Sequence, residues 1–287
     1  MQEAKANSSA QPNAGKVFVA VQAHVSDVPY YAAGLCTKLM AEGYTGYLIR
    51  TTNDETNGPQ TNAQNVLACE TDNTAMAKAL GFKDHFDLSY CAHRLNECSP
   101  VEFRGRLVFL FRMVKADTVI SFNPSSEGVA DSDQWLTGRA VNEACWVAGL
   151  PRDFHEQFEV GGFDPHPVRE RYWFYTRDGQ PFNQTVDISK YVDKKLDALV
   201  ECRSYGDGGA GSALRARLAA QGKRLPLLGN DDRSADRAYA REFLLEDSRT
   251  YAHGHGFEFA ERFYCQGPPQ DRNAKVEAYI KKNALNI

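Results

Sequence analysis

Runs of apolar residues alternate with amphipathic segments along the first half of the chain. Residues 17–22 (VFVAVQ) are apolar and rich in β-branched side chains, a pattern typical of a buried parallel strand. Residues 30–42 carry apolar side chains at helical spacing, and Gly43 is the type of residue that ends a helix. Residues 44–52 (YTGYLIRTT) then predict a second strand.

The alternation of strand and helix patterns continues to about residue 150. Strands are predicted over residues 85–90 and 117–122, and helices over residues 65–81, 100–116 and 134–149. This order predicts a parallel sheet with helices on both faces, a three-layer Rossmann-like α/β fold. Right-handed crossovers place the carboxyl ends of parallel strands at one edge, where ligands bind.

Three polar segments follow predicted strands and are therefore expected to converge at that edge: residues 22–27, 53–55 and 123–133. In the first segment, His24 and Asp27 lie three residues apart and can both face one metal ion. Neutral imidazole and carboxylate are ligands that suit zinc. The alternative is that Asp27 caps the following helix and His24 is only a polar turn residue.

The pattern is less regular in the second half of the chain. Residues 169–176 and 184–189 predict strands, which we expect to form a hairpin. Residues 190–205 predict an amphipathic helix.

The domain organisation follows from these patterns. Residues 1–16 are polar and small, and we expect a disordered tail. Residues 17–150 are expected to form the Rossmann-like core. Residues 151–287 are expected to complete the sheet and to form a C-terminal cap over the cleft.

Composition excludes several classes of function. The chain is 43% hydrophobic and 24% charged, which is typical of a soluble globular protein. Its formal net charge of −4 provides no general attraction to nucleic acid or to anionic membranes, so neither is an expected partner. No stretch approaches the roughly 20 apolar residues of a membrane span.

Cysteine usage bears on the compartment and on the metal chemistry. The seven cysteines are scattered without a CxxC pair, which argues against a zinc ribbon or a thioredoxin motif. Their odd number favours a reducing compartment, and we expect a cytoplasmic protein. A mature secreted chain remains the alternative, because residues 1–16 contain no apolar signal region.

The motif around His24 resembles the opening of the PIG-L/LmbE-like N-deacetylase family, whose motif is Ala/Pro-His-Pro-Asp-Asp before an apolar helix, a strand and an acidic loop. The resemblance continues in the family's order and covers most of the chain beyond residue 16. The matching segments are AHVSDVPYYAAGLCTKLMAEGYTGYLIRTTNDE (23–55), ETDNTAMAKALGF (70–82), YCAHRLNE (90–97), KADTVISFNP (115–124), DSDQWLTGRAVNEA (131–144), VDISKYVDKKLDALVECRS (186–204) and GFEFAERF (256–263).

The resemblance implies a zinc-dependent reaction that releases acetate from an N-acetylated substrate, usually a sugar. In the family, the motif's His, its second Asp and the last His of a later motif hold zinc, and the first Asp is the general base. Matched by position, His24 and Asp27 are two metal ligands and Gln134 takes the place of the third. Ser26 stands at the position of the base, and Asp131 at that of an auxiliary histidine.

These departures change the expected chemistry. A serine hydroxyl cannot act as a carboxylate base near neutral pH, and an amide oxygen such as that of Gln134 is a poor zinc ligand. Either Asp131 or Asp133 can supply the missing ligand or base, and Asp131 is our first candidate for the base. Oxygen-rich coordination favours Mn²⁺ or Mg²⁺ over zinc. Alternatively, Asp133 caps the helix over 134–149 and Asp131 is a solvated loop acid.

Two further residues are candidates for substrate contact. Arg94 and Glu97 match a region near the substrate edge in the family, and we expect them to bind hydroxyl groups. The leading hypothesis is therefore a metal-dependent N-deacetylase of an N-acetylated sugar-like small molecule, with a modified active site. The alternative is a catalytically inactive member that binds carbohydrate or a protein partner. A third hypothesis is metal-assisted hydration or lyase chemistry.

Overall fold

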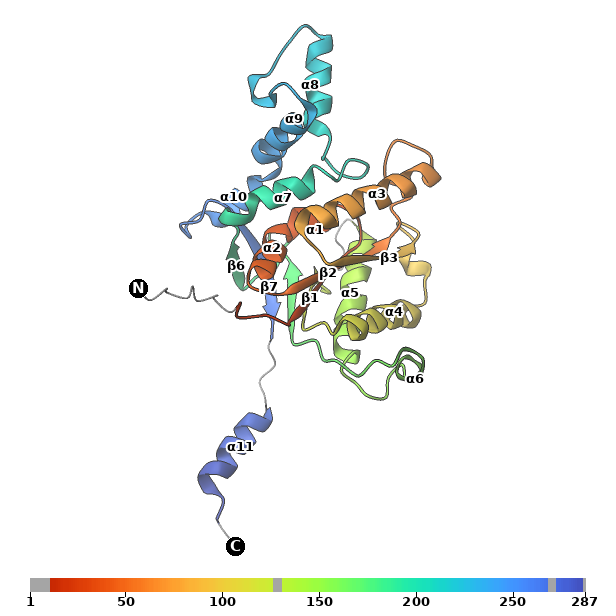
Figure 1. The fold of residues 1–287 in the computed structure, drawn as a ribbon, viewed down its shortest axis with the longest axis vertical. Helices are drawn as coiled ribbons and strands as arrows, with labels where there is room; N and C mark the ends of the chain where they lie inside the picture. Colours follow the sequence, from red (N-terminus) through yellow and green to blue (C-terminus); the bar gives the residue numbers. More distant parts are fainter. Residues whose placement is uncertain (1–10, 126–130, 268–271, 286–287) are drawn as a thin grey trace, which may run out of the picture.

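The computed structural model describes residues 11–125, 131–267 and 272–285. Its centre is a seven-stranded sheet with the strand order β3-β2-β1-β4-β5-β7-β6 (Figure 1). The strands are β1 (Val17–Gln22), β2 (Thr45–Thr52), β3 (Asp84–Tyr90), β4 (Thr118–Phe122), β5 (Glu170–Phe174), β6 (Gln184–Asp187) and β7 (Ala260–Gln266). The predicted three-layer, Rossmann-like α/β fold is confirmed.

The first five strands are all parallel. β1 lies at the centre, paired with β2 on one side and β4 on the other, and β3 and β5 extend the sheet outward. Every residue of β1 after Val17 is buried, which explains why it reads as a continuous apolar run. The predicted strands over 17–22, 44–52, 85–90 and 117–122 are confirmed to within a residue at each end.

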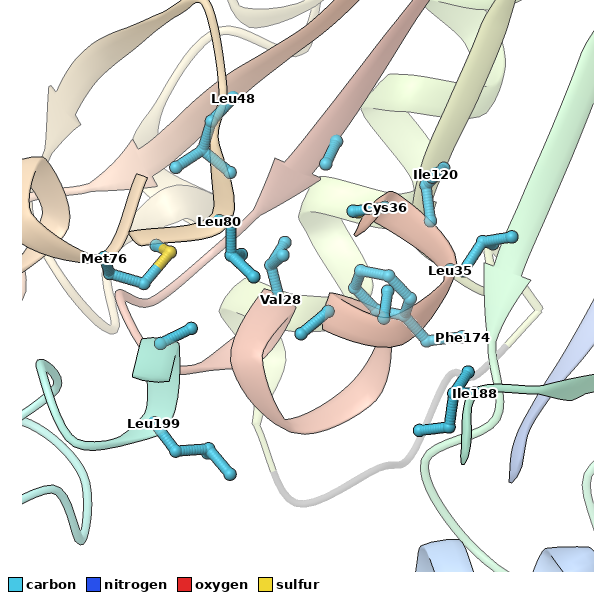
Figure 2. Packing of buried hydrophobic residues seen from close by; sticks show 14 of the residues in the cluster. Val28, Leu35, Cys36, Leu48, Met76, Leu80, Ile120, Phe174, Ile188 and Leu199 are labelled. Atoms are coloured by element: carbon cyan, nitrogen blue, oxygen red, sulfur yellow. The ribbon is translucent and has the colours of Figure 1, made fainter. Parts of the chain in front are cut away.

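Helices cover both faces of the sheet. The helices of the described chain are α1 (Asp27–Tyr31), α2 (Ala33–Ala41), α3 (Asn62–Leu80), α4 (Pro100–Val114), α5 (Ser132–Val147), α6 (Glu156–Gly161), α7 (Val192–Leu199), α8 (Ala210–Ala220), α9 (Asp232–Tyr239), α10 (Glu246–Ala252) and α11 (Arg272–Asn283). A core that includes Leu35, Met76 and Leu199 joins α2, α3 and α7 to one face (Figure 2). A second core, with Leu107 and Val141, joins α4 and α5 to the other face.

The ends of the helices agree with the sequence signals in most places. Gly81 follows α3 in the left-handed conformation with φ 93°, and Pro100 opens α4 after Ser99, whose side chain accepts a hydrogen bond from the backbone of Glu102. The start of α5 differs from the prediction. Asp131, not Asp133, is the N-cap, because its Oδ1 accepts a hydrogen bond of 2.8 Å from the backbone N–H of Asp133.

The predicted hairpin between residues 169–176 and 184–189 is wrong. Both segments contain strands, β5 and β6, but β7 lies between them and is antiparallel to each. β7 was not predicted as a strand. Its pairing joins residues that are between 73 and 95 positions apart in the sequence, a relation that local patterns do not carry.

Some helices of the second half of the chain, and residues 11–16, lie outside the sheet and its covering helices. α8 and α9 project from one end of the molecule, and α11 lies apart from the sheet at the opposite end (Figure 1). Residues 1–10 of the predicted tail lie outside the described residues, whereas the backbone N–H of Asn13 donates to the carbonyl of Glu42. No helix among the described segments combines the length and apolar character needed to cross a membrane.

Candidate metal centre

Three loops bring acidic and histidine side chains together at the carboxyl edge of the parallel strands. His24 follows β1, Asp54 follows β2, and Asp131 precedes α5. The His24 ring is buried, with Nδ1 2.6 Å from Asp54 Oδ1 and Nε2 2.7 Å from Asp131 Oδ2. The expected convergence of the three polar segments is confirmed.

Four side chains form a group that can hold a metal ion. His24, His93, Asp131 and Asp133 each offer a ligand atom, and these atoms all lie within 4.8 Å of one another. Asp133 is fully buried, and its Oδ2 accepts a hydrogen bond from the backbone N–H of His93. Its Oδ1 has no hydrogen-bond partner among the described residues. A buried carboxylate oxygen without a partner is costly, and a bound cation or water molecule can supply the missing partner.

The charges in the group are strongly coupled. Burial by itself lowers the pKa of His24, but the hydrogen bonds to Asp131 and Asp54 raise it well above its usual value. Burial raises the pKa of Asp131, yet the hydrogen bond with His24 holds that pKa below its usual value. Burial also raises the pKa of Asp133. Asp131 has the His24 ring at 2.7 Å as a counter-ion, whereas Asp133 has no such hydrogen bond to His24. The acidic groups therefore surround a position that favours positive charge.

Asp54 is the residue that orients His24. Its carboxylate accepts hydrogen bonds from the His24 ring, from the backbone N–H of Val25 at 3.1 Å and from Arg50 Nη1 at 3.2 Å. Arg50 in turn donates from Nε to Asp87 at 2.7 Å. A carboxylate on Nδ1 fixes the ring orientation and leaves Nε2 to face a ligand. Asp54 has φ 57°, a conformation that asparagine and aspartate adopt more readily than most residues.

Asp27 and Gln134, predicted as metal ligands, lie against each other beside this group. Asp27 Oδ2 accepts hydrogen bonds from the backbone N–H groups of Ala23 and His24 at 3.0 and 2.7 Å. Its Oδ1 accepts one from Gln134 Nε2 at 2.9 Å. Asp27 therefore binds the turn before α1 instead of capping that helix. Burial raises the pKa of Asp27 to about 7.

Ser26, predicted at the base position, is buried at the N-cap of α1 without a side-chain capping bond. The segment after α7 covers this side of the site. The Tyr205 ring lies edge-on to the His24 ring with centroids 5.2 Å apart, and a Cβ placed on Gly206 would be 3.3 Å from Ser26 Cβ. Asp72 Oδ2 holds the segment by accepting from the backbone of residues 203 and 204.

Arg94 and Glu97, the predicted substrate contacts, form an exposed ion pair directly after His93. Arg94 Nε donates to Glu97 Oε2 at 2.9 Å, and both side chains are more than half exposed. They lie outside the group of four, so their role in binding remains a prediction. Two site residues were missed from the sequence. Asp54 belongs to the acidic loop after β2, and His93 directly precedes Arg94 in the segment of residues 90–97.

Sequence comparison finds no match for this chain. No family model matches it, and no curated protein is similar to it in sequence.

Solved structures with a similar fold include deacetylases and a hydratase. The N,N′-diacetylchitobiose deacetylase of Pyrococcus horikoshii, solved with an inhibitor, has a TM-score of 0.69 at 19% identity over 88% of this chain and 84% of that chain. GalB of Pseudomonas putida KT2440, a 4-carboxy-2-hydroxymuconate hydratase, has a TM-score of 0.63 at 17% identity, covering 90% and 99%. The zinc-inhibited form of teicoplanin deacetylase Orf2 has a TM-score of 0.51 at 12% identity, covering 89% and 100%. The resemblance to PIG-L/LmbE-like deacetylases is thereby confirmed for the fold.

Proposed function

We propose that this protein is a metal-dependent amidase that removes the acetyl group from an N-acetylated sugar or a related small molecule. The observation that carries the proposal is the group of four ligand atoms around His24, with the unpartnered Asp133 Oδ1 among its side chains. The likeness in fold to two deacetylases supports the class of reaction.

His24, His93 and Asp133 are the metal ligands in this proposal. Two imidazoles and one carboxylate form a ligand set that suits zinc and leaves a fourth position open, as hydrolytic sites require. The neighbouring carboxylate of Asp131 makes the site rich in oxygen, so manganese is the second candidate. In this proposal His93 and Asp133 bind the metal in place of Asp27 and Gln134, which the sequence predicted as ligands. Asp27 then shapes the turn that carries His24, and Gln134 orients Asp27.

Asp131 is the general base in this proposal. An ion held by these residues would supply polarisation of the amide carbonyl and a lower pKa for a water molecule at the site. Asp131 Oδ2 lies beside His24 Nε2, and its side chain is 20% exposed, so it can reach both water and substrate. It accepts the proton of the attacking water and returns a proton to the leaving amine. The chain thereby supplies the carboxylate that Ser26 lacks.

The substrate class is drawn from the site and from one neighbour. The name of the Pyrococcus horikoshii enzyme states that it acts on N,N′-diacetylchitobiose. In this chain, the Tyr205 ring beside His24 offers an apolar surface for one face of a sugar. The Arg94–Glu97 pair offers a donor and an acceptor for hydroxyl groups.

The test combines metal content with turnover. We expect one zinc or manganese ion per chain by elemental analysis after purification without chelator, and acetate release from N-acetylglucosamine or N,N′-diacetylchitobiose. His93→Gln and Asp133→Asn are expected to lower metal content and turnover by at least tenfold. His155→Gln, which removes an exposed histidine of a separate loop, is the matched control and leaves both unchanged.

Three outcomes would contradict parts of the proposal. Metal that is retained in both variants and lost in Asp27→Asn would return the ligand role to Asp27. Metal with no acetate from a broad N-acetyl panel would favour hydration or lyase chemistry. Ligand-induced stabilisation without metal or turnover would favour a binding protein without catalytic activity.

A further inference from the structure

A small cavity lies at the carboxyl end of β5, on the edge of the sheet that carries the metal centre. It has a volume of 130 Å³ and is enclosed by α1, the residues after β5, α10 and β7. Tyr31 of α1, Tyr175 directly after β5 and Tyr251 of α10 form part of its walls. Pockets for complete drug-sized molecules have about 300–1,000 Å³, so this cavity has room for one group of a substrate.

The cavity and the metal centre are close neighbours. β5 is parallel to β1 and separated from it by β4, which places the carboxyl ends of β1 and β5 two inter-strand spacings apart, about 10 Å. Tyr31 lies four residues after Asp27 on α1, a rise of about 6 Å. Burial raises the pKa of Tyr31 to about 12, and the carboxylates of Asp27, Asp247 and Asp131 add to the rise. A small-molecule substrate at the metal centre can therefore extend to the cavity.

Hydrogen-bond donors in the cavity wall lack acceptors within the described chain. Arg262 Nε is buried without a partner. The hydroxyl groups of Tyr31, Ser248 and Tyr251 form no hydrogen bond with any described residue. Burial raises the pKa of both tyrosines, so these hydroxyl groups keep their protons near neutral pH. Donors without acceptors are costly when buried, and a ligand with several oxygen atoms supplies the acceptors.

Arg262 also gives the cavity a positive charge without a counter-ion. Its Cζ lies 4.4 Å from the centroid of the Phe182 ring and 4.7 Å from that of Tyr251, and no described carboxylate is within ion-pair distance. Of the two acids in the wall, Glu261 is paired with Lys195 at 2.8 Å. The other, Asp247, is exposed, so water and salt screen its charge. The least screened unpaired charge is therefore that of the guanidinium.

We propose that this cavity binds an anionic group of the substrate, a carboxylate or a phosphate, while the acetamido group lies at the metal centre. Arg262 Nε donates a charge-assisted hydrogen bond to the anion, and the hydroxyl groups of Tyr31 and Tyr251 donate to its other oxygens. The substrate is then an N-acetylated sugar acid or sugar phosphate. The place of the acetamido group rests on the proposed function, whereas the binding of the anion does not.

The test measures binding to the chelator-treated full chain by isothermal titration calorimetry. The probes are N-acetylglucosamine 6-phosphate, N-acetylmuramic acid and the neutral N-acetylglucosamine. At least one acidic sugar is expected to bind about tenfold or more tightly than the neutral sugar, and the tighter of the two identifies the group as phosphate or carboxylate. Arg262→Gln is expected to remove the preference. Arg241→Gln removes an arginine that also lies over an aromatic ring but outside the cavity, and is expected to keep it.

Asp247→Asn tests the sign of the charge without changing a buried group. Removal of this exposed carboxylate is expected to tighten the binding of the acidic sugar about 2- to 5-fold. Weaker binding would indicate a neutral or cationic group and would overturn the proposal. Equal affinity for acidic and neutral sugars, which a cavity filled only by water gives, would also overturn it. A preference that survives Arg262→Gln would do the same.

Turnover distinguishes this proposal from the proposed function. In metal-loaded protein, Arg262→Gln is expected to raise KM for the acidic sugar and to leave KM for N-acetylglucosamine unchanged. Preferential binding of the anion without acetate release would contradict deacetylation and support the anion site. Acetate release from acidic and neutral sugars with equal KM would contradict the anion site alone.

Discussion

Two buried charged clusters hold this fold together in different ways. In the first, Lys195 on α7 donates to Glu261 on β7 at 2.8 Å and to the backbone carbonyl of Tyr30 at 2.6 Å. Glu261 also accepts from the backbone N–H groups of Gly34 and Leu35 at the start of α2, a helix without a side-chain cap of its own. The carboxylate thus satisfies N–H groups that the helix leaves unpaired and favours its positive end.

The second cluster surrounds His24 and is not satisfied in the same way. Asp133 Oδ1 and Arg50 Nη2 are buried without a hydrogen-bond partner among the described residues. Asp54 and His93 both have positive φ values, 57° and 60°. Unpaired buried groups and unusual backbone conformations collect at functional sites, where a ligand completes the set. Complete pairing of its polar atoms, and not burial or charge, therefore separates the structural cluster from the candidate site.

The largest effect is expected from breaking the paired cluster. Glu261→Leu leaves the Lys195 ammonium buried without a counter-ion and two helix N–H groups unpaired. We expect the free energy of unfolding to fall by about 3–5 kcal/mol, measured by denaturant titration. Adding Lys195→Met should recover part of that loss. A change below about 1 kcal/mol would contradict the structural role of the pair.

Metal binding should stabilise the unsatisfied cluster by a similar amount. At metal concentrations of 100 to 1,000 times the dissociation constant, chelator-treated protein is expected to gain about 2.7–4.1 kcal/mol. Differential scanning calorimetry with and without zinc or manganese measures this gain. His24→Ala should abolish it, and His155→Gln should preserve it. An equal gain in His24→Ala would place the binding elsewhere.

The orientation of His24 should matter less than its presence. Asp54→Asn removes the carboxylate that fixes the ring, and we expect metal affinity to fall about 10- to 100-fold, measured by competition with a chelating dye. Asp87→Asn is the matched control, because it removes the other carboxylate on Arg50 without touching His24. Equal losses in both variants would attribute the effect to charge and not to orientation.

The smallest expected effect is a gain in stability, in contrast to the losses expected from the other substitutions. Asp133→Asn replaces a buried carboxylate that has one unpartnered oxygen, and we expect the metal-free protein to become more stable by about 1 kcal/mol. The same variant is expected to lose the stabilisation by metal. Chemical denaturation in the presence and absence of chelator measures both quantities. Lower stability of the metal-free variant would indicate that Asp133 is a structural residue.

The parallel half of the fold was predictable because its signals are local. β1 and β4 are buried on both faces and therefore read as mainly apolar runs, and Gly81 and Pro100 mark helix ends. The strand topology rule then predicts that His24 and Asp131 lie at one edge, and in the structure their side chains are in hydrogen-bond contact. The sequence therefore predicts at which edge of the sheet the site lies and three of the loops that form it.

The remaining details depend on contacts between distant residues. His93 joins the site through Asp133, 40 residues along the chain, and Asp54 meets His24 across 30 residues. No spacing rule connects such pairs. The position of β7 between β5 and β6 was missed for the same reason, since register and pairing are set by packing across the sheet.

The position of β7 between β5 and β6 affects how the protein folds during its synthesis on the ribosome. β6 pairs only with β7 in the described sheet, and β5 needs β7 on its outer side. A nascent chain that has emerged to residue 250 therefore carries an open gap in its sheet, with unpaired strand edges that other chains can join. Only when residues 260–266 leave the exit tunnel can the last strand enter and close the gap. The growing polypeptide is thus most exposed to aggregation and to chaperone capture late in its synthesis, after most of its length is already folded.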